Sequence, residues 1–125
     1  MKAPSESTML KYWRAAVRAK RGNQCIWDGC HNKAEEIHHY IHRRYKLTAY
    51  DEENGLPLCK GHHAQADRLY GRELLRKYLD VAYLQGLSMH GTVKNYLSVT
   101  GQTRAELLHA TLARLKEITR EADTL

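Results

Sequence analysis

The 125-residue sequence contains no phenylalanine and only two prolines, so its core must be built from leucine, tyrosine, valine, isoleucine and two tryptophans. No apolar run approaches the roughly 20 residues that cross a bilayer, and no charged stub followed by an apolar stretch opens the chain. We therefore expect neither a membrane span nor a secretory signal. Three cysteines, an odd number, cannot all pair within one chain, which predicts free or metal-bound thiols in a reducing, cytoplasmic compartment.

Positive charge is the first feature that the sequence does contain. Lysine and arginine outnumber aspartate and glutamate 20 to 14, the formal net charge is +6, and the isoelectric point is near 9.3. The whole excess lies in residues 1–77, because basic and acidic residues are equal in number over 78–125. An anionic partner is favoured, with nucleic acid first. We expect the first part of the chain to contact it.

Length and hydrophobic patterning predict a single domain over residues 1–125, of α+β class and mainly helical. Apolar residues recur at helical spacing over 10–17. This indicates an N-terminal helix that Ser7 or Thr8 caps and Gly22 ends. Two short segments favour β-strands, at 36–41 and 55–58.

A C-terminal helical extension is expected over residues 72–125. Thr103 and Glu106 have the spacing of a capping box, which predicts a last helix running to about Ala122. Its apolar stripe either belongs to the core or supports a homodimer, so monomer and homodimer both stay open. The stripe consists of Leu107, Leu108, Thr111, Leu112, Leu115 and Ile118. Shorter helices are expected at about 60–69, 72–84 (with Leu74, Leu75, Tyr78, Leu79 and Ala82 facing inward) and 93–97.

All three cysteines fall into two short knuckles. Cys25 and Cys30 have four residues between them in a C-x4-C pair, and Cys59 and His62 form a C-x2-H pair further along. Three thiolates and one imidazole match a tetrahedral structural zinc site, although three unrelated thiols are the alternative. On a helix, Cys59 and His62 share a face while His63 is turned away by about 100°, which favours His62 as the zinc ligand.

A second cluster lies between and beside these knuckles. His39, then Asn54, then His63 follow one another in an order that resembles the HNH (His-Asn-His) endonucleases. The run from His38 to His63 is most similar to small phage and prophage HNH proteins, and more loosely to phage recombination nucleases that act on branched DNA. The resemblance covers residues 23–70. It implies a small zinc-stabilised ββα-metal (HNH) core there, between the N-terminal helix and the helical extension.

The resemblance also implies residue roles. His39 would be the general base that takes a proton from the attacking water, and Asn54 would tie the hairpin loop together and orient His39 by hydrogen bonding. His38 and His63 would hold a catalytic Mg²⁺ or Mn²⁺ ion, with other divalent transition metals also acceptable to a histidine-rich site. Asp67 follows His63 by four residues, so on one helix it would share that face and could be a third ligand.

The implied activity is hydrolysis of DNA phosphodiester bonds, with 5′-phosphate and 3′-hydroxyl products, in bacterial host cytoplasm if the gene is of phage origin. The DNA could be branched or nicked. Arg43, Arg44 and Lys46 follow the catalytic strand and are expected to contact flanking phosphates, unless they are only solvated loop charges. Neighbouring strand residues point to opposite faces, so one of His38 and His39 could instead be packed. The alternative function is a zinc-stabilised nucleic-acid-binding module without catalysis.

Overall fold

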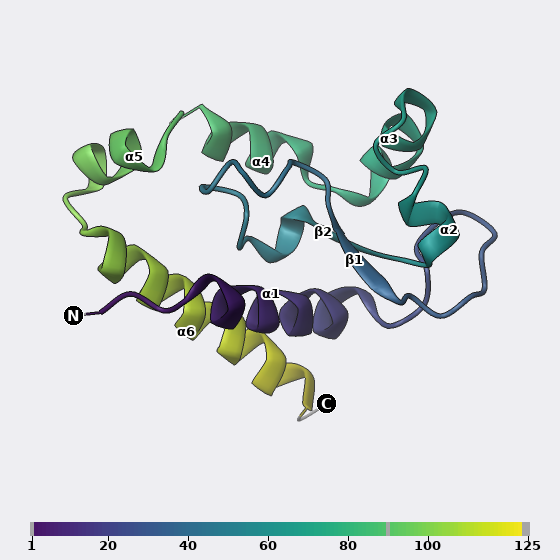
Figure 1. Cartoon of the computed structure of the whole chain (residues 1–125), viewed down its shortest axis with the longest axis horizontal. Helices are drawn as coiled ribbons and strands as arrows, with labels where there is room; N and C mark the ends of the chain where they lie inside the picture. Colours follow the sequence, from purple (N-terminus) through teal and green to yellow (C-terminus); the bar gives the residue numbers. More distant parts are fainter. Residues whose placement is uncertain (1, 90, 124–125) are drawn as a thin grey trace.

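The computed structural model describes residues 2–89 and 91–123. Within them the protein is α+β and mainly helical, as expected, with one two-stranded antiparallel sheet (Figure 1). The elements in chain order are α1 (Glu6–Arg21), β1 (Glu36–His39), the 3₁₀ helix η1 (Glu52–Asn54), β2 (Gly55–Leu58), α2 (Lys60–His63), α3 (Leu69–Leu75), the 3₁₀ helix η2 (Arg76–Tyr78), α4 (Val81–Ser88), α5 (Val93–Thr100) and α6 (Arg104–Asp123). None of the described helices is both long and apolar enough to cross a membrane.

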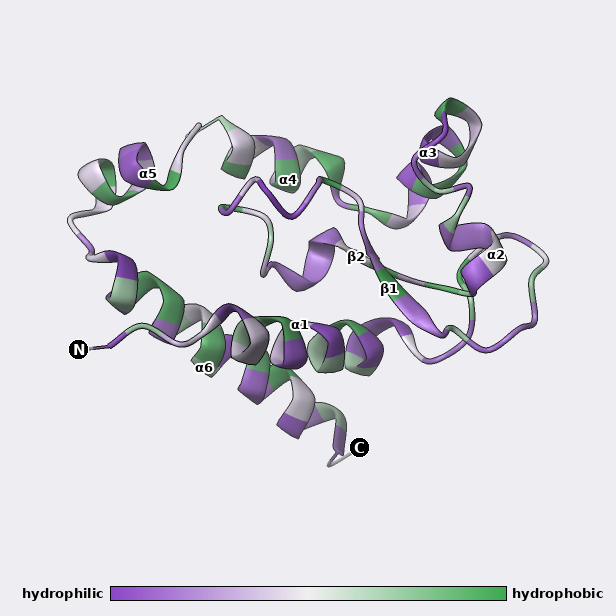
Figure 2. Ribbon diagram, viewed as in Figure 1, coloured by the Kyte–Doolittle hydropathy of each residue, from purple (hydrophilic) through white to green (hydrophobic). Residues whose placement is uncertain are grey.

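The first and last helices pack against each other (Figure 1). Hydrophobic residues alternate with hydrophilic ones along both, and their apolar faces form one cluster (Figure 2). Leu108, Leu112 and Leu115 of α6 are buried in that cluster beside Trp13 and Val17 of α1. The apolar stripe predicted for the last helix therefore belongs to the core, so its buried leucines do not form a free docking surface.

The ends of these helices are set by side-chain caps. The Ser5 hydroxyl accepts a hydrogen bond from the Thr8 N–H, so the cap predicted at Ser7 or Thr8 is wrong by two or three residues. The capping box is confirmed, because Thr103 and Glu106 each accept a hydrogen bond from the other's backbone N–H. Gly22, at φ 86°, ends α1 as predicted.

The β-hairpin joins two apolar clusters. In its antiparallel register His38 lies opposite Leu56, and His39 lies opposite Gly55. α1 packs on one face of β2, where Gly55 leaves room for Val17 and Trp13. Leu56 on the other face belongs to a second cluster, which also contains two of the cysteines. β1 is thereby held with one face towards α1 and the other towards α2. The strand ends at His39, two residues earlier than expected.

The helical segments after the hairpin differ from the prediction. The helix expected over 60–69 ends at His63 as the single turn α2, and turns lead on to α3. The helix expected over 72–84 is split, because Leu79 is extended and buried and Asp80 caps a new helix by accepting a hydrogen bond from the Tyr83 N–H. Ala82, expected to face inward, is exposed. Periodicity could not reveal these breaks because tertiary burial of Leu79 decides them. The helix expected at 93–97 is confirmed as α5.

Gly71 offers a test of how α3 packs on the turn that follows α2. A Cβ at Gly71 would lie 2.2 Å from the Gln65 carbonyl oxygen and 3.2 Å from the Ala66 Cα, and backbone atoms cannot move aside cheaply. We expect Gly71→Ala to lower the free energy of unfolding by about 1–3 kcal/mol, the usual cost of overpacking. Gly86→Ala in α4 is the control, because open space surrounds Gly86 and alanine favours helix by about 1 kcal/mol. Urea denaturation should rank Gly86→Ala above Gly71→Ala; equal stabilities would contradict this packing.

Candidate metal centre and adjoining cleft

Four residues of the two predicted knuckles come together beside the second apolar cluster: Cys25, Cys30, Cys59 and His62. Their ligand atoms all lie within 4.8 Å of one another. The His62 Nδ1 atom is 3.3 Å from the Sγ of Cys59 and 3.6 Å from the Sγ of Cys25. Three sulfur donors and one nitrogen donor in this arrangement could bind a metal such as zinc.

The local structure supports metal binding at this cluster. The Trp27 ring stacks on His62 with ring centroids 4.5 Å apart and fixes the imidazole plane. Burial raises the pKa of Cys25 to about 11, whereas the backbone N–H of His62 lowers the pKa of Cys59. A buried thiol of this kind becomes a thiolate when a bound cation compensates its charge, as zinc does. The donor set therefore fits zinc in both chemistry and burial.

His63 lies outside the four-residue cluster and faces β1 instead. Its Nδ1 atom is 3.3 Å from the Glu36 Oε1 atom, and its ring centroid is 5.1 Å from that of His38. The single turn of α2 thus directs two neighbouring histidines to different places. The assignment that helical spacing favours, with His62 at the cysteines, agrees with the structure.

A cleft of about 470 Å³ lies between α1, β1, the loop after β1 and the end of α2. It brings together residues that are distant in the sequence. They include Arg14, His38, His39, Arg43, His63 and Asp67. His38 and His39 are neighbours on β1 and point to opposite faces of the strand, yet both line this one cleft.

His39 is held in one orientation and one tautomer. Its Nε2 atom is 2.9 Å from the Ala49 carbonyl oxygen, which can only accept, so Nε2 donates and Nδ1 carries the lone pair. The Trp13 ring stacks on the imidazole at 3.8 Å, and its Nε1 donates to the Asp51 carbonyl oxygen at 2.7 Å. Burial lowers the pKa of His39 to about 4, so the ring is neutral at pH 7. A neutral, oriented imidazole with an available lone pair suits a general base.

His38 has an unsatisfied buried nitrogen. Its side chain is 3% exposed, and its Nε2 atom makes no hydrogen bond. That atom lies 3.7 Å from the Asp67 Oδ1 atom, beyond hydrogen-bond distance. Burial lowers the pKa of His38 to about 4, so this nitrogen is not kept as a cation beside the carboxylate. Imidazole and carboxylate are ligand types that divalent cations accept, but among the described residues the cysteine cluster is the group of three or more such ligands that lies close enough together to hold a metal ion.

Asp67 reaches the cleft by a route that the sequence did not predict. Because α2 ends at His63, helical spacing is not what places Asp67 near it, and that part of the expectation is wrong. A series of turns carries the chain back instead, and Asp67 lies near both His38 and Arg72. Asp67 is exposed and lines the cleft.

Glu36 and Trp13 are residues of the cleft that sequence reasoning missed. Glu36 precedes His38 by two positions on β1, and residues two apart on a strand share a face. That alternation was the signal that could have found it. Trp13 was predicted only as a core residue of α1, and no local pattern links it to His39.

Asn54 ties the loop after β1 to the hairpin. It is fully buried, its Oδ1 accepts from the Ile41 N–H at 2.7 Å, and its Nδ2 donates to the carbonyls of Ile41 and Thr48. These bonds agree with the loop-tying role that the resemblance implies. Asn54 does not bond to the His39 ring, however. It holds the loop that carries Ala49, whose carbonyl does.

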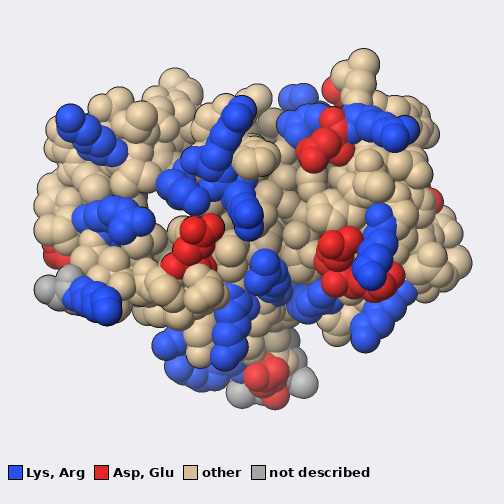
Figure 3. Space-filling view, viewed as in Figure 1, with Lys and Arg blue, Asp and Glu red and all other residues tan. Residues whose placement is uncertain are grey.

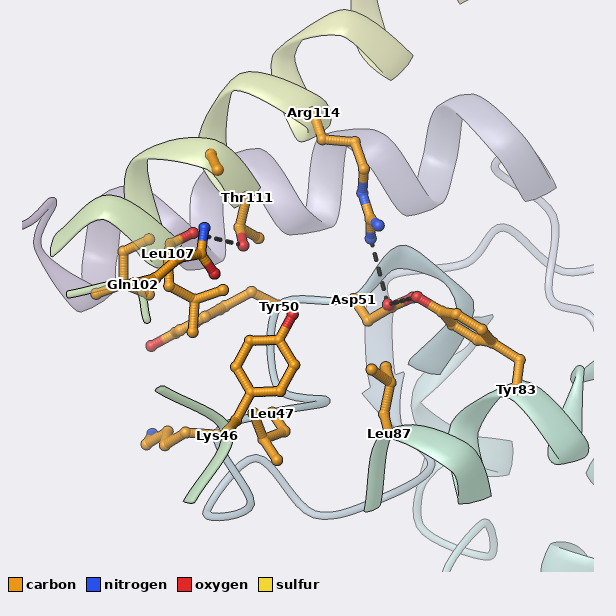
Figure 4. A pocket seen from close by; sticks show the side chains of 13 residues that line it. Lys46, Leu47, Tyr50, Asp51, Tyr83, Leu87, Gln102, Leu107, Thr111 and Arg114 are labelled. Atoms are coloured by element: carbon orange, nitrogen blue, oxygen red, sulfur yellow. Dashed lines mark hydrogen bonds and ion pairs between the residues drawn. The ribbon is translucent and has the colours of Figure 1, made fainter. Parts of the chain in front are cut away.

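The three predicted DNA-contacting residues do not share one surface. Arg43 lines the cleft. Arg44 turns back on its neighbour, with its guanidinium over the Tyr45 ring and its Nη2 donating to the Tyr45 hydroxyl at 3.1 Å. Lys46 lines a separate cavity of about 310 Å³ between the loop, α4 and α6 (Figure 4).

The separate cavity shows what the helical extension does for the loop. The buried carboxylate of Asp51 accepts hydrogen bonds from the Tyr83 hydroxyl of α4 and from Arg114 of α6 (Figure 4). Asp51 and Ala49 supply the two carbonyls that hold Trp13 and His39. The extension therefore braces the segment that orients the candidate base.

The chain matches no model of a protein family, no curated protein and no solved structure. The features that bear on function are therefore the four-residue cluster, the cleft, and the sequence motif to which residues of both belong.

Proposed function

We propose that the protein is a metal-dependent DNA endonuclease of the HNH type, which hydrolyses phosphodiester bonds to leave 5′-phosphate and 3′-hydroxyl ends. The observation that carries this proposal is the state of His39. Its Nε2 atom donates to the Ala49 carbonyl, the Trp13 ring stacks on the imidazole, and within the described chain no hydrogen bond occupies Nδ1. The positive charge of the chain supports a nucleic-acid substrate.

In this proposal the His39 Nδ1 atom accepts a proton from a water molecule as the water oxygen bonds to phosphorus. The bond from phosphorus to the 3′ oxygen breaks, and the 3′ oxygen takes a proton from solvent. The imidazolium that forms keeps its hydrogen bond to the Ala49 carbonyl, which stabilises the positive charge. General-base catalysis of this kind contributes about 10²- to 10⁴-fold.

His38, His63 and Asp67 are the residues that would hold a catalytic divalent cation. The buried and unpaired Nε2 atom of His38 is the reason for this assignment. A cation bound there would stabilise negative charge on the phosphate and on the departing 3′ oxygen. Glu36, 3.3 Å from the His63 Nδ1 atom, orients that ring as an outer-shell carboxylate does. Mixed nitrogen and oxygen donors should accept Mn²⁺ as well as Mg²⁺.

Zinc at Cys25, Cys30, Cys59 and His62 has a structural role in this proposal. It would join the segment before β1 to the start of α2. Since His63 follows His62 directly, the same site would also place His63 against β1. Loss of zinc should therefore disturb the cleft as well as the fold.

Incubation of supercoiled plasmid with the protein tests the proposal directly. With Mg²⁺ or Mn²⁺ we expect nicked circles to appear before linear DNA, because one cleft cuts one strand at a time. Excess EDTA should stop the reaction, and renewed Mg²⁺ should restore it. If the plasmid stays supercoiled with every metal while a gel shift shows binding, the protein is a binding module without catalysis, and the proposal is wrong.

A further inference from the structure

We propose that Arg14 of α1 and Arg43 of the loop after β1 form a binding site for a DNA backbone phosphate that neighbours the cleaved one. The identity of the ligand rests on the proposed function. The site itself rests on two cations that the fold places on the rim of the cleft beside His39.

Both guanidinium groups are available to a ligand. Arg14 and Arg43 are exposed, and neither makes a hydrogen bond or an ion pair to any residue in the described part of the chain. Both side chains line the same cleft as His39.

The fold explains why Arg14 is at this rim. The Trp13 ring stacks on His39, and its Nε1 donates to the Asp51 carbonyl, so the angle of α1 against β1 is fixed at this point. Arg14, the next residue along α1, lines the cleft together with His39. Arg18, one turn later, also lines the cleft, but its Nη1 donates to the Ala34 carbonyl at 3.0 Å. Arg14 is left as the free cation that α1 presents to the cleft.

Acidic groups lie beside His38 and His63, since Glu36 is 3.3 Å from His63 and Asp67 is 3.7 Å from His38. A third acidic residue of the cleft, Glu35, pairs with Lys60. Arg14 and Arg43 line the same cleft and have no acidic partner among the described residues. A DNA strand that places its cleaved phosphate between the two histidines of β1 would carry a neighbouring phosphate to the arginines. Guanidinium groups suit this ligand because they bind phosphate oxygens in a bidentate manner.

Total charge alone does not locate this site. Figure 3 shows lysine and arginine side chains spread over one face of the molecule, with acidic groups among them. Lys20 is an exposed cation of the same helix that does not line the cleft. It provides a matched control, since its replacement removes the same charge from α1.

Binding of a fluorescein-labelled duplex, followed by anisotropy over a range of salt concentrations, tests the site. All variants carry His39→Ala so that the DNA is not cut. We expect Arg14→Gln and Arg43→Gln each to weaken binding by about 5- to 10-fold and to reduce the salt slope by about 1. Lys20→Gln should leave both unchanged. Arg14→Lys should keep the slope but lose part of the affinity, because it lacks the guanidinium fork.

The outcomes separate this proposal from the nuclease proposal. If the wild type cuts plasmid and Arg14→Gln binds DNA as Lys20→Gln does, the phosphate site is wrong and the nuclease proposal stands. If the wild type never cuts but Arg14→Gln and Arg43→Gln lose affinity and slope, the phosphate site stands and the nuclease proposal is wrong. Arg14, Lys20 and Arg43 are exposed, so their replacement should not disturb the core. Thermal melting should show that all variants are folded.

Discussion

His39→Ala is expected to slow the nicking of supercoiled plasmid by about 10²- to 10⁴-fold, which is the usual contribution of a general base. The reason is that the lone pair on the His39 Nδ1 atom accepts the proton in the proposed reaction. Donation from Nε2 to Ala49 and stacking on Trp13 leave this atom as the acceptor. Alanine removes the acceptor but leaves His38 and His63 in place. The rate should be measured with saturating Mg²⁺, so that a change in metal affinity does not enter.

Two controls make this result specific. His109→Ala removes a histidine of α6 whose Nε2 atom bonds to the Lys2 carbonyl at 2.7 Å, and which does not line the cleft. It should nick at the wild-type rate. His39→Ala should still bind duplex DNA, because the arginines of the cleft are intact. A His39→Ala protein that binds DNA and nicks as fast as the wild type would remove His39 from the mechanism.

His62→Ala and His63→Ala are expected to differ sharply although they alter neighbouring residues of one helical turn. His62 belongs to the cysteine cluster, and structural zinc sites in small peptides contribute about 10–16 kcal/mol. That is comparable to the whole stability of a small domain, about 5–15 kcal/mol. We expect His62→Ala to lose most of its bound zinc and to melt far below the wild type.

His63→Ala should keep one zinc per chain and a melting temperature near that of the wild type. Since His63 faces His38 and Glu36 in the cleft, this variant should lose metal-dependent nicking instead. Zinc content by atomic absorption and thermal melting by circular dichroism measure the two effects. Loss of zinc from His63→Ala, with zinc retained in His62→Ala, would reverse the assignment of the two histidines.

Local spacing predicted the features that depend on nearby residues. The N-terminal helix, the two strands and the capping box of Thr103 and Glu106 are present because each is decided within a few residues of chain. The four-residue cluster was also predictable. The cysteines and the histidine of the two short knuckles are ligand types that can bind one metal ion together, which favours their approach. The helical period separates His62 from His63.

Features that depend on long-range packing were not predictable. The break at Leu79 and Asp80 follows from burial of Leu79 against the second cluster, which no local period reveals. The same is true of Asp67, which returns to His38 through turns rather than along a helix. Arg44 follows β1 in sequence, but it turns back on its neighbouring tyrosine.

The sequence by itself determined which residues have the chemistry for the cysteine and histidine metal cluster, because ligand type and short spacing are properties of the covalent chain. It also placed the excess of positive charge in residues 1–77. Only the tertiary structure decided that Trp13 stacks on His39, that Arg14 lines the same cleft as His39, and that the last helix packs against the first. These contacts join segments far apart in the chain, and they form only where burial of apolar surface outweighs the entropy of closing the loops between them.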